Sequence, residues 1–230
     1  VFEASVDSTT QKRISNTTIL RIWDALWLPD SDAFIARFLN DDSSDVDSFY
    51  AEIKTQIIEG EESNINTEGS LEGSFLQSGI IELALSESKD KIFYLVPSGD
   101  GSIGIISDPD GSKKVQVFTS PLSQWIAQWP EGNKVALTTK PSANIPGYLY
   151  FLNTDTEKLE KILSDLRGLT TLVNKERTKV LFTQTEADRL LLSILDIKSG
   201  EITDLPIWTL AEKCIWSDTN SDIIYCGVPT

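Results

Sequence analysis

The stretch Trp129–Leu137, WPEGNKVAL, places a large apolar residue before a polar turn, which is followed by an apolar run. The same pattern occurs at Trp27–Ile35, Leu85–Phe93, Val173–Leu181 and Trp216–Ile224. The first residues of the five stretches are 58, 44, 44 and 43 residues apart. Because self-similarity at a fixed period marks a repeat architecture, we expect a structural unit of 43–44 residues.

A second turn precedes four of these stretches by about 20 residues. The four turns are Val6–Thr9, Asp108–Gly111, Asn153–Thr156 and Asp196–Gly200. Asp, Asn, Gly and Ser reverse the chain readily, and the flanking segments are rich in strand-forming residues. One repeat therefore holds two hairpins, or four strands, which is the content of a propeller blade. A β-sandwich also has closely spaced strands but does not require this period, so we predict an all-β propeller of four-stranded antiparallel blades, with about five represented.

The long first spacing contains about 14 residues more than the others, most naturally within Thr55–Gly79. This segment is rich in Glu, Ser, Asn and Gly, so it is expected to form a long surface loop. Long loops on rigid scaffolds either carry function or are passive, and the sequence leaves both open.

Two cysteines, Cys214 and Cys226, flank a turn expected at Asp218–Asp222. A hairpin centred on this turn places them opposite each other, at the separation of about 4.5–5.5 Å that a disulfide can span. We predict a structural disulfide, which indicates an oxidising compartment. The alternative is a pair of small buried thiols in a cytosolic protein.

The composition excludes several classes of partner and of chemistry. The formal charge of −15, from 35 acidic and 20 basic residues, disfavours nucleic acid and anionic membrane surfaces. No apolar stretch reaches the length of about 20 residues that spans a bilayer. Histidine is absent, so Ser-His-Asp and Cys-His nucleophiles and His-ligated metals cannot be built from this chain. We expect no catalytic residues, no cofactor and no metal.

Three weaker motifs have ordinary structural explanations. The stretch Gly99–Gly104 matches the letters of a dinucleotide fingerprint, but a strand follows it, so a hairpin turn is predicted. Two groups of acidic residues could bind calcium: the first is Asp41, Asp42, Asp45 and Asp47, and the second is Asp108 and Asp110. Neither group has the ligand spacing of a known calcium-binding motif, so we expect both to be solvated turns. The six tryptophans could stack against sugars, but we expect most of them to lie in the core. The six are Trp23, Trp27, Trp125, Trp129, Trp208 and Trp216.

The repeated stretches resemble the TolB-like or WD40-like propeller repeat family over nearly the whole chain. The resemblance rests on the stretches WLPD at Trp27–Asp30, WPEGNK at Trp129–Lys134 and WSD at Trp216–Asp218. The segments Arg13–Ile19, Gly147–Asn153 and Glu212–Ser217 are similar to uncharacterised bacterial propeller proteins predicted to be exported. The second repeat departs from the pattern, because Leu85–Ser88 lacks the aromatic residue and the proline. The family has no shared catalytic motif to transfer.

The expected organisation is a single propeller domain. Its parts are a half blade at 1–15, blades at 16–79, 80–120, 121–164 and 165–206, and a half blade at 207–230. The two halves either join to close a five-bladed ring or belong to a larger ring of six to eight blades. We favour the larger ring, completed by further blades or by another chain, because members of the resembled family continue past this endpoint.

The leading hypothesis is a non-enzymatic module that binds a protein, or a glycan or other envelope polymer, through its blade loops. We expect it outside the cytoplasm, in the periplasm, on the cell surface or secreted, with any anchor lying in a segment outside this chain. One alternative is a glycosidase or lyase that uses a carboxylate pair, which needs no histidine. Another is a structural subunit of a cell-surface assembly.

Overall fold

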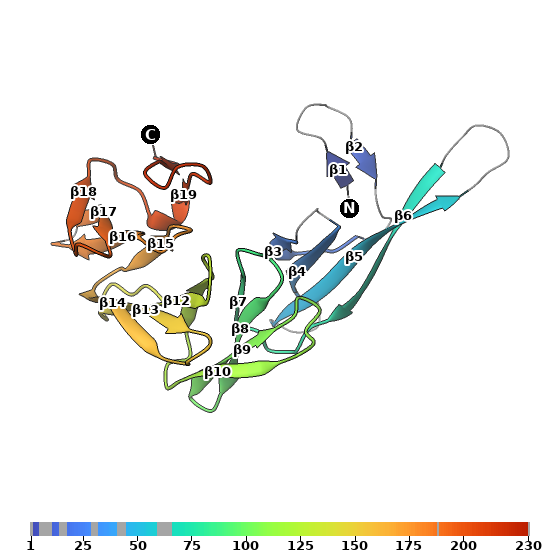
Figure 1. Cartoon of the computed structure of the whole chain (residues 1–230), viewed down its shortest axis with the longest axis horizontal. Helices are drawn as coiled ribbons and strands as arrows, with labels where there is room; N and C mark the ends of the chain where they lie inside the picture. Colours follow the sequence, from blue (N-terminus) through green and yellow to red (C-terminus); the bar gives the residue numbers. More distant parts are fainter. Residues whose placement is uncertain are drawn as a thin grey trace. The chain divides into compact units, whose positions relative to one another are not determined.

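The computed structural model describes residues 2–4, 11–13, 18–28, 32–40, 45–58, 66–187 and 189–229. These residues form four four-stranded and two two-stranded antiparallel sheets (Figure 1). The predicted all-β fold of four-stranded blades is confirmed. The segments Gln124–Trp129 and Leu159–Leu166, where helical spacing is possible, contain strands instead.

The strands follow one another along each sheet. The first complete sheet contains β3 (Ile22–Trp27), β4 (Ala33–Leu39), β5 (Val46–Ile58) and β6 (Asn66–Phe75). The second contains β7 (Glu82–Leu85), β8 (Ile92–Ser98), β9 (Gly101–Ser107) and β10 (Val115–Ser120). The third contains β11 (Trp125–Gln128), β12 (Lys134–Thr139), β13 (Gly147–Asn153) and β14 (Leu159–Leu166). The fourth contains β15 (Thr170–Val173), β16 (Lys179–Glu186), β17 (Arg189–Asp196) and β18 (Ile202–Leu205). The two-stranded sheets pair β1 (Phe2–Ala4) with β2 (Gln11–Arg13), and β19 (Cys214–Trp216) with β20 (Ile224–Cys226) after the short helix η2 (Ala211–Lys213).

The predicted turns lie between the third and fourth strands of their sheets. Asp108–Gly111 follows β9, Asn153–Thr156 follows β13, and Asp196–Gly200 follows β17. Short polar side chains stabilise these reversals, since the Asn153 carboxamide oxygen accepts hydrogen bonds from the amides of Asp155 and Thr156. The turn predicted at Val6–Thr9 lies outside the described residues.

The chain divides into two compact units, which we describe separately. Unit 1 comprises Val1–Ile80 and Ser107–Lys114, and unit 2 comprises Ile81–Ile106 and Val115–Thr230. In unit 2 the first strands of successive sheets lie side by side. The Gln128 amide of β11 donates to the Thr171 carbonyl and accepts from the Val173 amide of β15. In the same way the Trp216 indole of β19 donates to the Leu172 carbonyl of β15.

Apolar clusters fill the space between neighbouring sheets of unit 2. Phe93 and Phe118 of the second sheet pack with Trp125 and Val135 of the third. Ala136 and Phe151 of the third pack with Val180 and Phe182 of the fourth, and Leu181 of the fourth packs with Trp216. Because strand side chains alternate between faces, each sheet contributes one face to each neighbour.

The expectation of a long loop over Thr55–Gly79 is wrong for much of this segment. Strands β5 and β6 pair continuously from Phe49 opposite Phe75 to Ile58 opposite Asn66, and residues 59–65 lie outside the described part. The glycines here misled the prediction, because glycine in a strand can serve close approach rather than a turn. A Cβ on Gly73 would lie 1.9 Å from the Tyr50 carbonyl oxygen, so only glycine fits.

The expected core role holds for only some of the tryptophans. Trp125 and Trp216 are each 8% exposed, and Trp129 packs against the cluster between the second and third sheets. In contrast, Trp23 and Trp208 are 68% and 78% exposed, and Trp27 is 41% exposed. The ring of Trp27 contacts Phe34 of its own sheet.

Candidate functional site

The loops of unit 2 lie at two opposite ends of its sheets. The loops between first and second strands gather at one end, where the Glu131 amide donates to the Lys175 carbonyl and the Lys175 ammonium pairs with Glu87 at 2.6 Å. Loops between third and fourth strands lie at the same end, because neighbouring strands are antiparallel. We call this the charged end. The other loops therefore lie at the opposite end.

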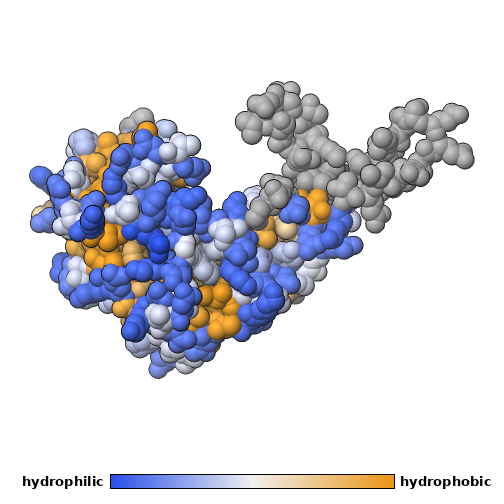
Figure 2. Space-filling view, in the orientation of Figure 1, coloured by the Kyte–Doolittle hydropathy of each residue, from blue (hydrophilic) through white to orange (hydrophobic). Residues whose placement is uncertain are grey.

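Five exposed apolar side chains of the described residues occupy the opposite end of unit 2. They are Ile81, Leu122, Ile145, Trp208 and Val228, with exposed fractions of 40%, 47%, 68%, 78% and 48%, and we call them the apolar edge. Each lies in the connection to a first strand, in a loop between second and third strands, or just after a second strand. Figure 2 shows that most of the visible surface of this unit is hydrophilic, with hydrophobic residues exposed in several places.

Hydrogen bonds hold the backbone of the apolar edge in place. The hydroxyl of buried Ser102 donates to the Leu122 carbonyl, and the Leu122 amide donates to the Ser120 hydroxyl. The amide of Ile145 donates to the Ser142 hydroxyl. Next to Trp208, the buried hydroxyl of Thr209 donates to the Gly227 carbonyl at 2.6 Å. The apolar side chains are thus presented from fixed backbone positions.

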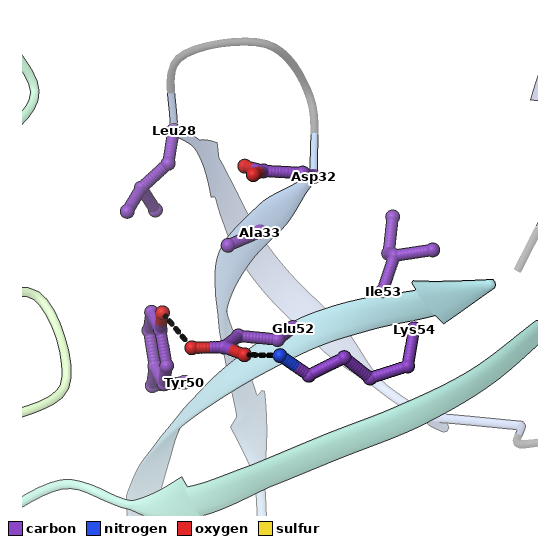
Figure 3. A pocket seen from close by; sticks show the side chains of 7 residues that line it. All are labelled: Leu28, Asp32, Ala33, Tyr50, Glu52, Ile53 and Lys54. Atoms are coloured by element: carbon purple, nitrogen blue, oxygen red, sulfur yellow. Dashed lines mark hydrogen bonds and ion pairs between the residues drawn. The ribbon is translucent and has the colours of Figure 1, made fainter.

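Unit 1 contains a cavity of about 350 Å³, lined by Leu28, Asp32, Ala33, Tyr50, Glu52, Ile53 and Lys54 (Figure 3). Alternation along β5 places Tyr50, Glu52 and Lys54 on one face of the strand. The Tyr50 hydroxyl donates to a Glu52 carboxylate oxygen at 2.9 Å, and the other oxygen pairs with the Lys54 ammonium. The sequence analysis missed this cavity, although the polar residues at every second position of β5 were a usable signal.

The electrostatics of the cavity keep Glu52 ionised. Hydrogen bonds from Lys54 and then Tyr50 lower the pKa of the Glu52 carboxyl group. Burial, followed by the hydrogen bond to Glu52 and nearby negative charge, raises the pKa of Tyr50 to about 12. A carboxyl group that acts as a general acid needs a raised pKa. The pKa of Glu52 is lowered, which disfavours that role.

We expect Tyr50 to ionise at about pH 12, above its ordinary value of 10.0. Replacing Glu52 by glutamine removes the negative charge and should lower the Tyr50 pKa. The unfolded chain loses this proton first as pH rises, so folding stability should fall between about pH 10 and 12. Ultraviolet titration at the phenolate band, with Tyr50→Phe identifying the transition, measures the shift. An unchanged titration in Glu52→Gln would contradict the assignment.

The candidate calcium ligands that lie within the described residues are engaged in local structure. Asp108 pairs with the Lys113 ammonium at 2.7 Å, and Asp110 accepts from the Ser112 amide at 2.8 Å. Asp47 accepts from the Asn40 amide group at 2.7 Å, and Asp41 and Asp42 lie outside the described residues. Within the described ranges, no group of three or more His, Cys, Asp or Glu residues is placed to hold a metal ion.

The two cysteines form a disulfide in the last hairpin. Cys214 lies directly opposite Cys226, with a Cα–Cα distance of 4.0 Å. Alternation places the disulfide on the same face as Trp216 and Ile224, which pack against the fourth sheet.

The stretch Gly99–Gly104 forms the β8–β9 hairpin, as predicted from its context. Among the helices of the described residues, none is long and apolar enough to cross a membrane.

The comparisons with known proteins show the fold. No protein-family model and no curated protein sequence match the chain. TolB from Acinetobacter baumannii has a TM-score of 0.57 at 10% identity, covering 80% of this chain and 43% of that one. The putative TolB from Agrobacterium tumefaciens gives 0.55 at 11%, covering 79% and 63%. An oligogalacturonate lyase in complex with manganese gives 0.61 at 8%, covering 88% and 58%.

The chain spans less than two thirds of the length of each of these three proteins. At 8–11% identity, the likeness concerns the fold and not the activity. The predicted resemblance is confirmed at this level. The chain has a TolB-like β-propeller fold.

Proposed function

We propose that this chain is a non-enzymatic binding module that holds a protein partner against the apolar edge of unit 2. The observation that carries the proposal is the strong exposure of apolar side chains at one end of the sheets. Trp208 and Ile145, at 78% and 68%, are the two most exposed large apolar side chains of unit 2. Exposed apolar side chains rimmed by polar surface are typical of interaction sites.

Trp208 is the strongest candidate for an anchor residue. Its side chain is 78% exposed, and tryptophan dominates the binding energy of many protein interfaces. The hydrogen bonds of Ser102, Ser142 and Thr209 fix the neighbouring backbone before a partner binds. Such preorganisation lowers the entropic cost of association and favours specific binding.

Charge supports a protein partner rather than nucleic acid. The net charge of −15 repels phosphate backbones, while apolar side chains at the edge contribute binding energy that depends little on salt. The TolB-like fold is compatible with a binding role, which remains a proposal for this chain. The alternative ligand is a glycan that stacks on Trp208, and the experiment below distinguishes it from a protein partner.

The enzymatic alternative has weaker support. Glycoside cleavage by a carboxylate pair needs one carboxyl group whose pKa is raised, so that it can donate a proton. The cavity of unit 1 offers Glu52, whose pKa is lowered by its hydrogen bonds with Lys54 and Tyr50. We therefore do not assign catalysis to this cavity.

Photo-crosslinking tests the proposed binding edge. A photoreactive phenylalanine analogue is placed at Trp208 or Ile145, and at Lys198 of the charged end as the matched control. We expect protein crosslinks from the first two positions only. With the captured partner purified, Trp208→Ser should weaken binding by about 30-fold or more, because a hot-spot residue contributes about 2 kcal/mol or more.

Three results would oppose the proposal. Equal crosslinking from Lys198 would remove the distinction between the two ends. An unchanged affinity in Trp208→Ser would remove its anchor. Binding of polysaccharides on a glycan array that is lost in Trp208→Ser would replace the protein partner with a glycan.

We further propose that the protein works outside the cytoplasm, in the periplasm, on the cell surface or in the medium. The Cys214–Cys226 disulfide supports this location, because such bonds persist in oxidising compartments. We expect both thiols in the native cell to resist a maleimide reagent until a reductant is added. Labelling of both cysteines without reductant would place the protein in a reducing compartment.

A further inference from the structure

The cavity of unit 1 combines an apolar wall with charged side chains of both signs. Leu28 and Ala33 are buried and supply the wall. Asp32 lies between them in the chain, and β5 contributes Tyr50 and Glu52, which Figure 3 shows on the other side of the space. The volume of about 350 Å³ is at the lower end for ligand pockets, so it suits a small molecule or a single side chain.

The hydrogen-bonding groups of the cavity leave mainly acceptors for a ligand. The Tyr50 hydroxyl and the Lys54 ammonium both donate to Glu52. The Tyr50 oxygen can still accept a hydrogen bond, because the hydroxyl has donated its only proton. Within the part of the chain that the structure describes, no donor bonds the Asp32 carboxylate. A ligand that enters the cavity must therefore bring its own donors.

The charge around the cavity favours a cationic ligand. Two carboxylates, those of Asp32 and Glu52, line the cavity against the one ammonium of Lys54. Burial and then the bond to Glu52 raise the pKa of Tyr50, and the negative charge of Asp110 adds to this shift. Asp110 belongs to the same unit. Its charge strengthens the negative potential, which attracts cations and repels anions.

We propose that this cavity binds a primary alkylammonium group, with the charged head near Asp32 and Tyr50 and the methylene stem against Leu28 and Ala33. An ammonium has three N–H donors, which match the acceptors on Asp32, Tyr50 and Glu52. A free amine and the lysine side chain of another protein both present this group. The proposal does not rest on the protein partner at the apolar edge, because that edge belongs to the other unit.

Nuclear magnetic resonance titration of the purified chain tests this site, with n-butylammonium chloride as the probe. We expect saturable shifts of the backbone amides around Ala33 and Glu52. Half-saturation should lie on the order of 1 mM, which is reasonable for a ligand of about five non-hydrogen atoms. The alcohol 1-butanol has the same size without the charge, and butyrate carries the opposite charge, so neither should cause these shifts.

Charge-changing variants test how the cavity recognises the cation. Asp32→Asn should weaken binding by about tenfold or more, because a hydrogen bond to a charged group contributes about that much. Lys54→Gln should instead strengthen binding by about threefold, because it removes the ammonium that competes for Glu52 in an exposed ion pair. Asp24→Asn is the matched control, since it removes the same charge from β3 outside the cavity lining and should leave the affinity unchanged. Circular dichroism verifies that each variant is folded.

Two peptide probes separate the two sources of the ammonium group. Gly-Lys-Gly with blocked termini presents the group on a peptide chain, and Gly-norleucine-Gly with blocked termini lacks the charge. Binding of Gly-Lys-Gly at least as tight as that of n-butylammonium would support a lysine side chain as the ligand. Binding of n-butylammonium without Gly-Lys-Gly would support a free amine.

Any of three results overturns the proposal. The first is the absence of saturable shifts up to about 20 mM n-butylammonium. The second is an equal response to 1-butanol, which would show an apolar pocket without charge recognition. The third is binding of butyrate that is lost in Lys54→Gln, which would show an anion site. None of these results would alter the crosslinks expected from Trp208, so the two proposals can fail separately.

Discussion

Leu137→Ala is expected to lower the free energy of unfolding of unit 2 by about 2–5 kcal/mol. Leu137 of β12 is 0% exposed and lies in the cluster between the second and third sheets, among Phe93, Leu95 and Leu152. Truncation removes buried methyl groups and leaves a cavity that rigid sheets on both sides cannot close. The loss should be large relative to the 5–15 kcal/mol that stabilises a typical domain.

A matched control lies in the same sheet. Leu159 of β14 is 48% exposed, so Leu159→Ala removes the same atoms from a position that water already reaches. We expect a change within about 0.5 kcal/mol, as is usual for surface substitutions. Urea denaturation followed by tryptophan fluorescence measures both variants. Equal losses in the two variants would contradict the assignment of the core to the space between the sheets.

The second large effect is expected from the disulfide. Reduction, or Cys214→Ser with Cys226→Ser, should destabilise the last hairpin by about 3 kcal/mol, the chain-entropy value for a small closed loop. The bond joins residues 12 positions apart in a two-stranded sheet, which is marginally stable without such support. The effect should be local, because the other sheets of unit 2 have four strands each.

Hydrogen exchange resolved by residue measures this local effect. The amides of β19 and β20 should lose protection on reduction, and Trp216 fluorescence should shift towards that of exposed indole. The amides of β12 should keep their protection. Reductant should have no further effect on the double serine variant, which separates disulfide loss from other actions of the reagent. Unchanged protection of β19 and β20 would show that packing on the fourth sheet suffices to hold the hairpin.

The disulfide connects the stability of the last hairpin with the proposed binding surface. The disulfide holds a hairpin whose inner face packs on the fourth sheet and whose outer face carries Ile215 and Tyr225. The carbonyl of Gly227, just after β20, accepts the hydrogen bond from Thr209 beside Trp208. Reduction should therefore weaken the anchor of the apolar edge as well as the last hairpin, whereas Trp208→Ser should affect only the anchor.

Much of the architecture was predictable from local sequence. The alternation of strand residues with Asp-, Asn- and Gly-rich turns predicted the hairpins of the second to fourth sheets and the opposition of Cys214 and Cys226. These features depend on neighbours along the chain or directly across a hairpin. The failures occurred in the β5–β6 hairpin, where the glycines of β6 suggested a loop, and at Trp27, which was expected to be buried.

The sequence by itself determined the repeat, the order of strands and turns, and the placing of the cysteines, because period and turn chemistry are encoded within each 44-residue stretch. Only the tertiary structure decided which apolar residues stay exposed and which polar ones meet. Trp27 and Trp216 each begin a repeated stretch, but one is 41% exposed and the other 8%. The difference arises from the neighbouring sheet, since burial depends on what packs against a face and not on the residue that occupies it.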